Sequence, residues 1–298
     1  MKSSKLLFGL LLAATFATSG CAAPKRVLVV TTTMGYRHSS IPLAEKVLGE
    51  LAQQSGAFTV DYARVDNDDP KFKGADGKPD KAKTSAAIQA VLAEKMSRAA
   101  LSNYDAVIFA NTTGDLPLPE REALLDFVKS GKGFVGVHAA TDTFPGFPGF
   151  IEMIGGQFKT HGPQVEVDII NQDPAFPACR HLGATWKLFD EIYQFKNFDR
   201  ATVRGLLTLD KHPNNGTPGD YPVAWMKKYG AGRVFNTSLG HREDVWSPGA
   251  KDPKGEIKNP PEVAKAFQQH LLAGIKWALA LEAGDATPQT GRKNVPLN

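Results

Sequence analysis

The chain has 298 residues, of which 42% are apolar and 22% are charged, and its formal net charge at pH 7 is +4. A chain of this length and composition buries a large core and lacks the low hydrophobicity that is typical of disordered proteins. The small, scattered positive charge excludes the basic stripe of a nucleic-acid-binding protein, so we expect no nucleic-acid partner.

The N-terminus has the pattern of a signal peptide over residues 1–20. MKSSK is basic, LLFGLLLAATFA is apolar but too short to span a bilayer, and TSGC places a cysteine where a lipoprotein signal would be cut. We expect Cys21 to be lipidated and to anchor the protein in the membrane, facing the periplasm. Ala22 gives no aspartate-type retention signal, which favours the outer membrane. The alternatives are cleavage after Ala23 and an uncleaved apolar anchor.

Strand-like and helix-like segments alternate through the first half of the mature chain. In order they are a strand at 26–33, a helix at 39–56, a strand at 58–64, a charged insertion at 66–83, a helix at 84–101, a strand at 104–111, a helix at 119–131 and a strand at 132–139. Strands separated by helices predict right-handed crossovers and a parallel sheet that is covered on both faces.

The second half is richer in strands and ends in one long helix. The expected strands are 165–171, 203–210, 222–229 and 232–240, and the helix is 261–280. Neither an internal repeat nor a linker is visible, so we predict a single domain over 26–283 and a flexible polar tail over 284–298. The predicted fold class is α/β, a flavodoxin-like sandwich with a mostly parallel central sheet.

Polar residues follow several of the predicted parallel strands. His38 follows the first strand, Asn111 and Asp115 the third, and His138 and Asp142 the fourth. The carboxyl ends of such strands meet at one edge, where ligands of open parallel sheets bind. His138 stands at the strand-to-loop turn that carries a Ser or Cys nucleophile in several α/β folds. The sequence contains neither GxGxxG nor GxxxxGK[ST], so it gives no support for a nucleotide site.

Six spaced motifs carry a resemblance to a known family. They are TTTMGYRHSS, GVHAATDTF, MIGGQFKTH, DEIYQF, YPVAWMKKYGAGRVFNTSLGHRED and GIKWALA. Together they resemble the ThuA-like family, named for bacterial trehalose utilisation and related to the class I glutamine amidotransferase fold, over about residues 26–281. The resemblance implies a small carbohydrate substrate, including routes through 3-keto sugars. Glutamine amidotransferases place their catalytic cysteine where His138 stands here, so cysteine-dependent amide hydrolysis is not expected.

Four histidines, His38, His138, His161 and His241, occur in these motifs, each in a loop or at a strand end. Imidazole is both the commonest proton-transfer group near neutral pH and the commonest metal ligand, whereas a lone loop histidine is usually only solvated. The separations match no compact zinc signature, so we predict acid–base catalysis with no cofactor and no tightly bound metal. A divalent metal held by the same histidines remains the alternative.

Two carboxylates are candidates to assist these histidines. Glu191 lies in an apolar, aromatic segment, where burial would favour its protonated form and suit it to acid or base work. An ion pair between Glu191 and Arg242 or another cation is the competing interpretation. Asp142 follows His138 closely enough to orient its ring, or it could cap a short helix near 147–156.

Candidate substrate-binding residues surround the same motifs. Sugar rings stack on aromatic side chains, most of which instead fill the core or anchor loops. The candidates are Asn111, Asp115, Asp142, Gln157, Tyr193, Arg242 and Trp246, with Trp246 expected in an exposed loop. Cys179 lies in a Pro-rich loop with no strand-to-helix turn and is expected to be a half-buried small residue rather than a nucleophile.

The leading functional prediction is an exported enzyme of carbohydrate catabolism that acts on a glycoside or a 3-keto sugar. His138 and one of the other motif histidines would exchange protons, and Glu191 would assist. The alternatives are a metal-dependent hydrolase that uses the same histidines and a non-enzymatic sugar-binding lipoprotein. The two enzymatic hypotheses require the histidines to converge with Glu191, and the third does not. The oligomeric state is not predicted.

Overall fold

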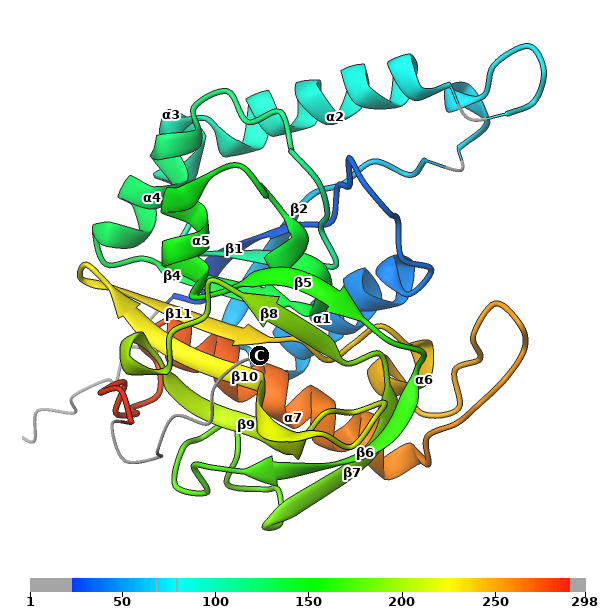
Figure 1. Ribbon diagram of the computed structural model, residues 1–298. Coiled ribbons are helices and arrows are strands. Elements are labelled where there is room, and N and C mark those ends of the chain that lie inside the picture. The colour runs from blue at the N-terminus through cyan, green and yellow to red at the C-terminus, as the bar shows by residue number, and fades with distance from the viewer. Residues whose placement is uncertain (1–22, 68, 79, 290–298) are drawn as a thin grey trace, which may run out of the picture.

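The computed structural model describes residues 23–67, 69–78 and 80–289 (Figure 1). The predicted signal peptide, Cys21 and the end of the predicted tail lie outside the described residues. The strands are β1 (Lys25–Val30), β2 (Phe58–Ala63), β3 (Ala106–Ala110), β4 (Gly133–Val137), β5 (Gln157–His161), β6 (Val165–Asn171), β7 (Thr185–Asp190), β8 (Tyr193–Lys196), β9 (Arg204–Lys211), β10 (Pro218–Tyr229) and β11 (Gly232–Thr237).

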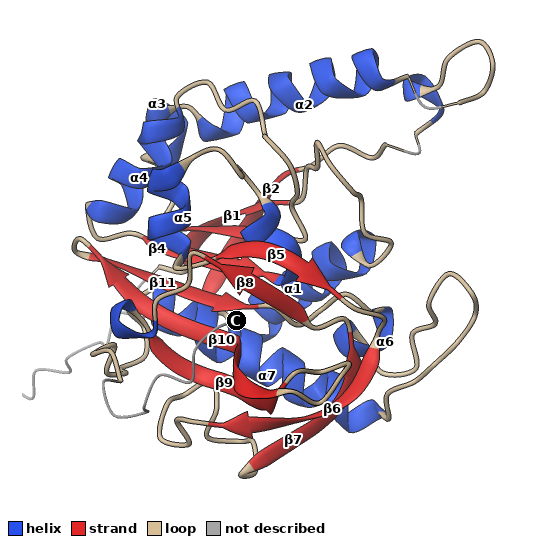
Figure 2. Ribbon diagram, in the orientation of Figure 1, coloured by secondary structure: helices blue, strands red, loops and turns tan. Residues whose placement is uncertain are grey.

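Helices connect or flank these strands (Figure 2). The α-helices are α1 (Ile41–Ser55), α2 (Lys81–Met96), α3 (Arg98–Leu101), α4 (Arg121–Lys129), α5 (Pro148–Ile154), α6 (Glu243–Trp246) and α7 (Pro261–Ala278), and the 3₁₀ turns are η1 (Pro70–Phe72), η2 (His138–Asp142) and η3 (Arg200–Thr202). None of the helices in the described part of the chain is both long and apolar enough to cross a membrane.

One nine-stranded sheet organises the molecule, in the order β2-β1-β3-β4-β11-β10-β9-β6-β7. The neighbours from β2 to β11 are parallel, and those from β11 to β7 are antiparallel. The α/β fold class is therefore the predicted one, and the β-rich second half extends the same sheet. Because Ala110, Val137 and Thr237 are in register, β3, β4 and β11 end together, and the residues that follow them gather at one edge.

Helices cover both faces of the parallel half, as predicted. One hydrophobic core lies under α1 and α7, and a second lies under α2, α4 and α5. Strand β1 shows why: Val27 to Val30 have no exposed surface, because both faces of the strand are covered. Helix α1 buries Ile41, Ala44, Leu48 and Leu51 at helical spacing, and it ends at Gly56, whose left-handed backbone is the usual helix stop.

A separate two-stranded ribbon, β5 with β8, packs against the antiparallel half near β10 (Figure 1). Its aromatic side chains form a small third core with Trp225 of β10. The sequence did not predict β5, β7 or β8. QFKTH and YQFK are only five and four residues long and show no clear alternation, so their strand structure depends on packing against β10.

Two local features differ from, or add to, the predictions. The expected helix 84–101 is broken at Ser97, whose side chain accepts a hydrogen bond from the Ala100 N–H and so begins a new helix. Gly114 has φ +77°, and a Cβ there would lie 2.7 Å from the backbone nitrogen of Gly35. The tight approach of these two loops therefore requires glycine.

Candidate metal centre

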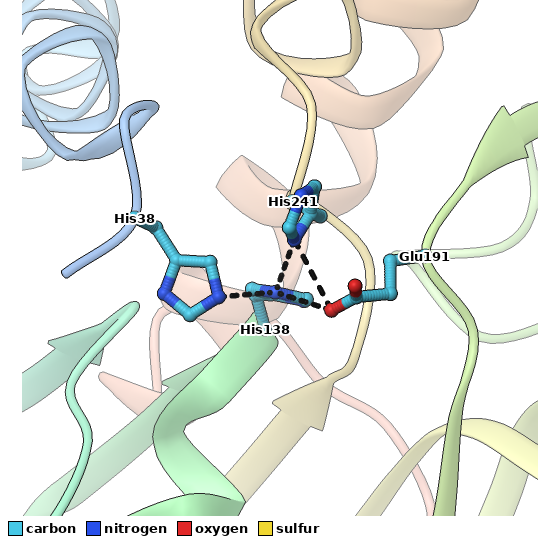
Figure 3. A group of neighbouring side chains, drawn as sticks. All are labelled: His38, His138, Glu191 and His241. Atoms are coloured by element: carbon cyan, nitrogen blue, oxygen red, sulfur yellow. Dashed lines mark hydrogen bonds and ion pairs between the residues drawn. The ribbon is translucent and has the colours of Figure 1, made fainter. Parts of the chain in front are cut away.

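Three histidines and one glutamate converge at the carboxyl edge of the parallel strands (Figure 3). They are His38, His138, His241 and Glu191, and one nitrogen or oxygen atom from each lies within 4.8 Å of all the others. His138 Nε2 lies 3.2 Å from His38 Nε2 and 3.3 Å from His241 Nδ1. Glu191 Oε2 lies 3.1 Å from His241 Nδ1 and 3.7 Å from His138 Nε2.

The topology explains why these distant residues meet. His138 follows β4 directly, His38 lies between β1 and α1, and His241 follows β11. Glu191 comes from the far half of the sheet, in the turn between β7 and β8. His138 itself has φ +50°, a left-handed conformation that is uncommon for a residue other than glycine and that turns the chain sharply after the strand.

One hydrogen bond fixes the tautomer of His138. Its Nδ1–H donates to the Ser238 carbonyl oxygen at 2.9 Å, and a carbonyl can only accept. Nε2 of the neutral ring therefore carries a lone pair that faces the other three residues. Burial lowers the pKa of His138 well below its ordinary value, and His38 and His241 add to the effect. The ring stays neutral across the physiological range.

The other two histidines differ in their electrostatics. Burial, together with the nearby His241 and His161, lowers the pKa of His38 to about 3. Burial also lowers the pKa of His241, but its hydrogen bond with Glu191 and the charges of Asp190 and Glu191 outweigh it, so the net shift is upward. His241 is therefore the histidine of the cluster that must lose a proton before all three rings can act as ligands.

The spacing of the four atoms fits a transition-metal ion. Ligands about 2.0–2.1 Å from a tetrahedral ion lie about 3.3–3.4 Å from one another. Four of the six pairwise separations, from 3.1 to 3.7 Å, bracket that value, and the two that involve His38 with His241 and with Glu191 are within 4.8 Å. Imidazole and carboxylate ligands suit Zn²⁺ and the other divalent first-row metals. The bond from His138 Nδ1 to a backbone carbonyl is also the usual outer-shell support of a metal-bound histidine.

His161, the fourth predicted histidine, lies just outside this cluster. Its Nδ1 is 2.9 Å from the Gly162 carbonyl oxygen and 3.1 Å from Glu191 Oε1. The side chain is 43% exposed, whereas that of His138 has no exposed surface. The structure thus brings together all five predicted catalytic residues, with four of them in the cluster and His161 between Glu191 and solvent.

One family of known proteins matches most of this chain. The sequence model of ThuA, described as trehalose utilisation, matches residues 26–251.

The chain belongs to the ThuA family.

Two solved structures of ThuA-like proteins are similar to this family member. One, from Parabacteroides merdae ATCC 43184, is 21% identical with a TM-score of 0.60 and covers 86% of this chain and 90% of its own. The other, from Bacteroides uniformis ATCC 8492, is 19% identical with a TM-score of 0.61 and covers 88% of this chain and 95% of its own. At these identities the likeness shows the fold alone. No curated protein matches the chain.

A network of hydrogen bonds holds the loop that carries His241 in this ThuA-family chain. The carboxylate of Asp190 accepts hydrogen bonds from the backbone N–H of Gly240 at 2.8 Å and of Arg242 at 3.2 Å. The Gly240 carbonyl accepts from Trp246 Nε1, Asn111 Nδ2 and Ser40 Oγ. Burial raises the pKa of Asp190 to about 6.

Three residues that support the cluster or the His241 loop were not among the predicted site residues: Asp190, Ser40 and Ser238. Asp190 lies directly before Glu191, so its nearness to that candidate was a usable signal. Ser40 stands at the N-cap position of α1, where serine is common for structural reasons alone, and Ser238 acts through its backbone carbonyl, for which sequence gives no signal.

Two predicted substrate-binding residues instead support this loop. Trp246 has no exposed surface and lies in α6, so the expectation of an exposed loop was wrong. Its indole packs edge-on against Phe267 and donates to Gly240. Asn111 is also fully buried, and its side-chain amide donates to Ser40 Oγ at 2.9 Å as well as to Gly240. In this conformation both side chains hold the loop and cannot reach a ligand.

Arg242 and Gln157 have structural partners. Arg242 is 2% exposed, and its guanidinium bonds to Asp244, Gln164 and Asp252. An ion pair between Arg242 and Glu191 is therefore wrong, whereas the other form of the competing interpretation, a pair with another cationic group, is met by His241, whose pKa is raised. Gln157 is 6% exposed, donates to the Pro145 carbonyl and accepts from Asn197.

Asp115 and Asp142 lie apart from the histidine cluster. Asp115 is exposed and pairs with Arg121 at 2.7 Å. Asp142 does not orient His138, because the His138 Nδ1–H donates to Ser238 instead. Asp142 does not cap α5 either, since the residue at that cap is Phe147.

Tyr193 is close to the cluster but is 4% exposed. Its ring centroid lies 4.6 Å from that of His138, and its ring stacks on His161 at 5.9 Å. Tyr193 therefore fixes the rings of both histidines by packing. Contact of this residue with substrate stays a prediction.

A pocket of about 710 Å³ opens beside the cluster. Glu191, His161 and His241 line it, together with Tyr36, Phe189 and the segment from Asp252 to Lys258. His38 and His138 do not line it, and they are 4% and 0% exposed. A ligand in this pocket would thus reach the cluster from the side of Glu191 and His241. The volume suits a small molecule.

Cys179 is buried and free, and burial raises the pKa of its thiol far above the ordinary value. Its structural role agrees with the prediction that it is not a nucleophile.

His270 of α7 offers a pH test that is independent of the cluster. It is fully buried, its Nδ1–H donates to the Ala178 carbonyl at 2.8 Å, and burial lowers its pKa to about 4. The unfolded chain takes up a proton at this residue below about pH 6.5, whereas the folded chain does so only near pH 4. The neutral ring's contribution is therefore intact above pH 6.5 and declines as the pH falls.

We expect His270→Gln to flatten the pH dependence of the free energy of unfolding. Between pH 6.5 and 4 the wild type should lose about 3 kcal/mol more than the variant, from about 1.4 kcal/mol per pH unit. Urea unfolding at several pH values measures the free energy of unfolding of the wild type and of the variant. Parallel pH profiles would mean that His270 is not kept neutral by burial.

Proposed function

We propose that His38, His138, His241 and Glu191 bind one divalent transition-metal ion, which this chain uses to hydrolyse a carbohydrate. The observation that carries the proposal is the convergence of their four ligand atoms within 4.8 Å, with the His138 lone pair fixed inward by Ser238. Four electron-rich atoms at such separations are stabilised by a shared cation or by shared protons.

The burial of His138 and His38 favours a shared metal cation over shared protons. The acid–base hypothesis requires His138 to exchange a proton with substrate, but His138 has no exposed surface and its pKa is lowered well below its ordinary value. His38 is nearly as buried, with a pKa of about 3. A metal ion bound by these two buried rings would also contact Glu191 and His241, which line the pocket, so substrate in the pocket could reach the ion.

The proposed ion supplies Lewis acidity, which lowers the pKa of bound water towards 7 or polarises a carbonyl group. His161 is placed to carry the proton. Its Nδ1 is engaged by the Gly162 carbonyl and Glu191, and its half-exposed ring lines the pocket. A histidine with one nitrogen held and the other free is the usual arrangement for general acid–base work.

The pocket favours a neutral, hydroxyl-rich substrate. Of the three Lys and Arg residues that line it, Arg242 pairs with Asp244 and Asp252 and Lys258 pairs with Glu256, whereas Lys254 lies beside the carboxylates of Asp252 and Glu256 in the lining. Tyr36, which is 67% exposed at the rim, offers a face for a sugar ring. The trehalose-utilisation family supports the carbohydrate class, and the sequence resemblance adds 3-keto glycosides to the substrates that should be tried.

Export and lipidation of Cys21 remain part of the proposal, supported by the order of the basic, apolar and TSGC segments in the sequence. Labelling of cells with a fatty-acid analogue tests it. Equal labelling of wild type and Cys21→Ser would refute it.

Turnover of a sugar panel tests the enzymatic proposal. Tag-free protein is incubated with disaccharides and their 3-keto derivatives, before and after chelation and after metal is restored. We expect hydrolysis of at least one compound, lost on chelation and recovered with a divalent transition metal. Hydrolysis that survives complete removal of metal would instead support the acid–base hypothesis. Saturable sugar binding without turnover would support a binding protein.

A further inference from the structure

A second pocket, of about 400 Å³, lies on the other side of the loop that carries His38. Arg37, Thr33 and Met34 line it from the β1 side, and Lys81, Ser85 and Ile88 line it from α2. Tyr36 faces the 710 Å³ pocket described above, whereas its neighbour Arg37 faces this one. The two pockets are therefore separated by the loop itself.

Polar groups in this second pocket lack partners. Arg37 is half-buried, and its Nη1 is buried with no hydrogen-bond partner among the described residues. Thr33 is 4% exposed, and its hydroxyl is likewise without a partner within the described part of the chain. A buried polar atom without a partner costs free energy, and a charged one costs more. A ligand or an ordered water in the pocket would supply the missing hydrogen-bond partners.

The charged residues of the pocket indicate the sign of the ligand's charge. Arg37 and Lys81 are its cations, and no carboxylate is among its lining residues. Arg37 also borders a hollow that contains three carboxylates, Glu45, Asp66 and Glu94, none of which lines this pocket. The Glu45 carboxylate already accepts hydrogen bonds from Thr31 and Arg64, and Glu94 pairs with Lys95. The Asp80 carboxylate caps α2 through the N–H groups of Ala82 and Lys83. The anion must therefore be held by side chains rather than by the helix terminus.

We propose that this pocket binds a small organic oxyanion, a molecule with a phosphate or carboxylate group, through Arg37, Lys81 and the hydroxyls of Thr33 and Ser85. The guanidinium supplies paired N–H donors of the geometry that oxyanions accept, and lysine adds a second positive charge. Met34 and Ile88 add apolar surface, and the volume exceeds what an inorganic ion needs. The site does not depend on the proposed metal centre.

Binding of inorganic phosphate, sulfate and acetate tests the site, by titration calorimetry and by the shift in Tm at constant ionic strength with chloride as the reference. We expect phosphate or acetate to bind the wild type and to bind Arg37→Gln and Lys81→Gln at least about ten-fold more weakly. Lys83→Gln is the matched control, because Lys83 makes the same charge change two residues away without lining the pocket. Its affinity should equal that of the wild type.

The arms of the experiment separate the outcomes. Stronger binding of phosphate and sulfate than of acetate assigns a tetrahedral oxyanion, and the reverse assigns a carboxylate. Binding that persists in His138→Ala shows that the anion does not coordinate the metal. Equal affinity in wild type, Arg37→Gln and Lys81→Gln, or no binding of any of the three anions above chloride, would overturn the proposal.

Discussion

His138→Ala is expected to remove the bound metal and to reduce turnover by at least about 100-fold. The substitution deletes the ligand whose lone pair is fixed towards the centre of the cluster, and loss of even an outer-shell partner typically costs 10–100-fold in metal affinity or activity. It also leaves the Ser238 carbonyl without its donor in a fully buried place, so we expect a loss of about 1–3 kcal/mol in stability. Metal content, turnover and urea unfolding measure the three effects.

His270→Ala is the matched control for this experiment. His270 is also fully buried and donates through Nδ1 to a backbone carbonyl, but it lies outside the cluster. It should lose similar stability and keep its metal and its activity. If His138→Ala keeps full metal content and full turnover while it folds, His138 is neither a ligand nor a catalytic residue.

His161→Ala is expected to separate metal binding from catalysis. His161 is not one of the four clustered ligands, so the metal content should stay at the wild-type level. Turnover should fall by about 100-fold or more, because proton transfer by a placed side chain contributes about 10²–10⁴ in rate. The loss should appear mainly in kcat rather than in KM.

His181→Ala controls for removal of a partly exposed histidine that bonds to a carbonyl oxygen. His181 Nε2 lies 2.9 Å from the Ala266 carbonyl oxygen, and His181 belongs neither to the cluster nor to the lining of the 710 Å³ pocket. Its kcat should be unchanged. A His161→Ala protein with normal kcat would contradict the role of His161 as proton carrier, and one that has lost its metal would make His161 a ligand.

The parallel half of the sheet and its functional edge could be predicted from sequence because the information is local. Apolar runs such as Val27 to Val30 mark buried strands, and parallel strands must end at the same edge, which brings His38 and His138 together. That Glu191 joins them depends on β7 and β8, which were not predicted: β8 has only four residues, and β7 alternates between exposed and buried positions although its sequence TWKLFD mixes polar and apolar residues on its exposed face. Its choice as a candidate rested on residue type and surroundings.

Errors in the predicted site arose where an aromatic ring or a polar side chain was taken as a sign of ligand contact. Trp246 and Asn111 donate their side-chain hydrogen bonds to the Gly240 carbonyl, which is on the loop that carries His241. A buried loop next to a functional site needs such donors, and their side chains resemble those of sugar-binding residues. Sequence alone cannot separate these roles, because the difference lies in which way the side chain points.

Elemental analysis of tag-free wild-type protein tests the central claim most directly. The three imidazoles and the Glu191 carboxylate are expected to retain about one equivalent of a divalent transition metal per chain through gel filtration. The apparent affinity for the metal should fall as the pH drops below the raised pKa of His241, because the proton competes with the metal for the ring nitrogen. Protein that is fully active yet contains no transition metal, and that takes up none when Zn²⁺, Mn²⁺ or Co²⁺ is supplied, would contradict the account.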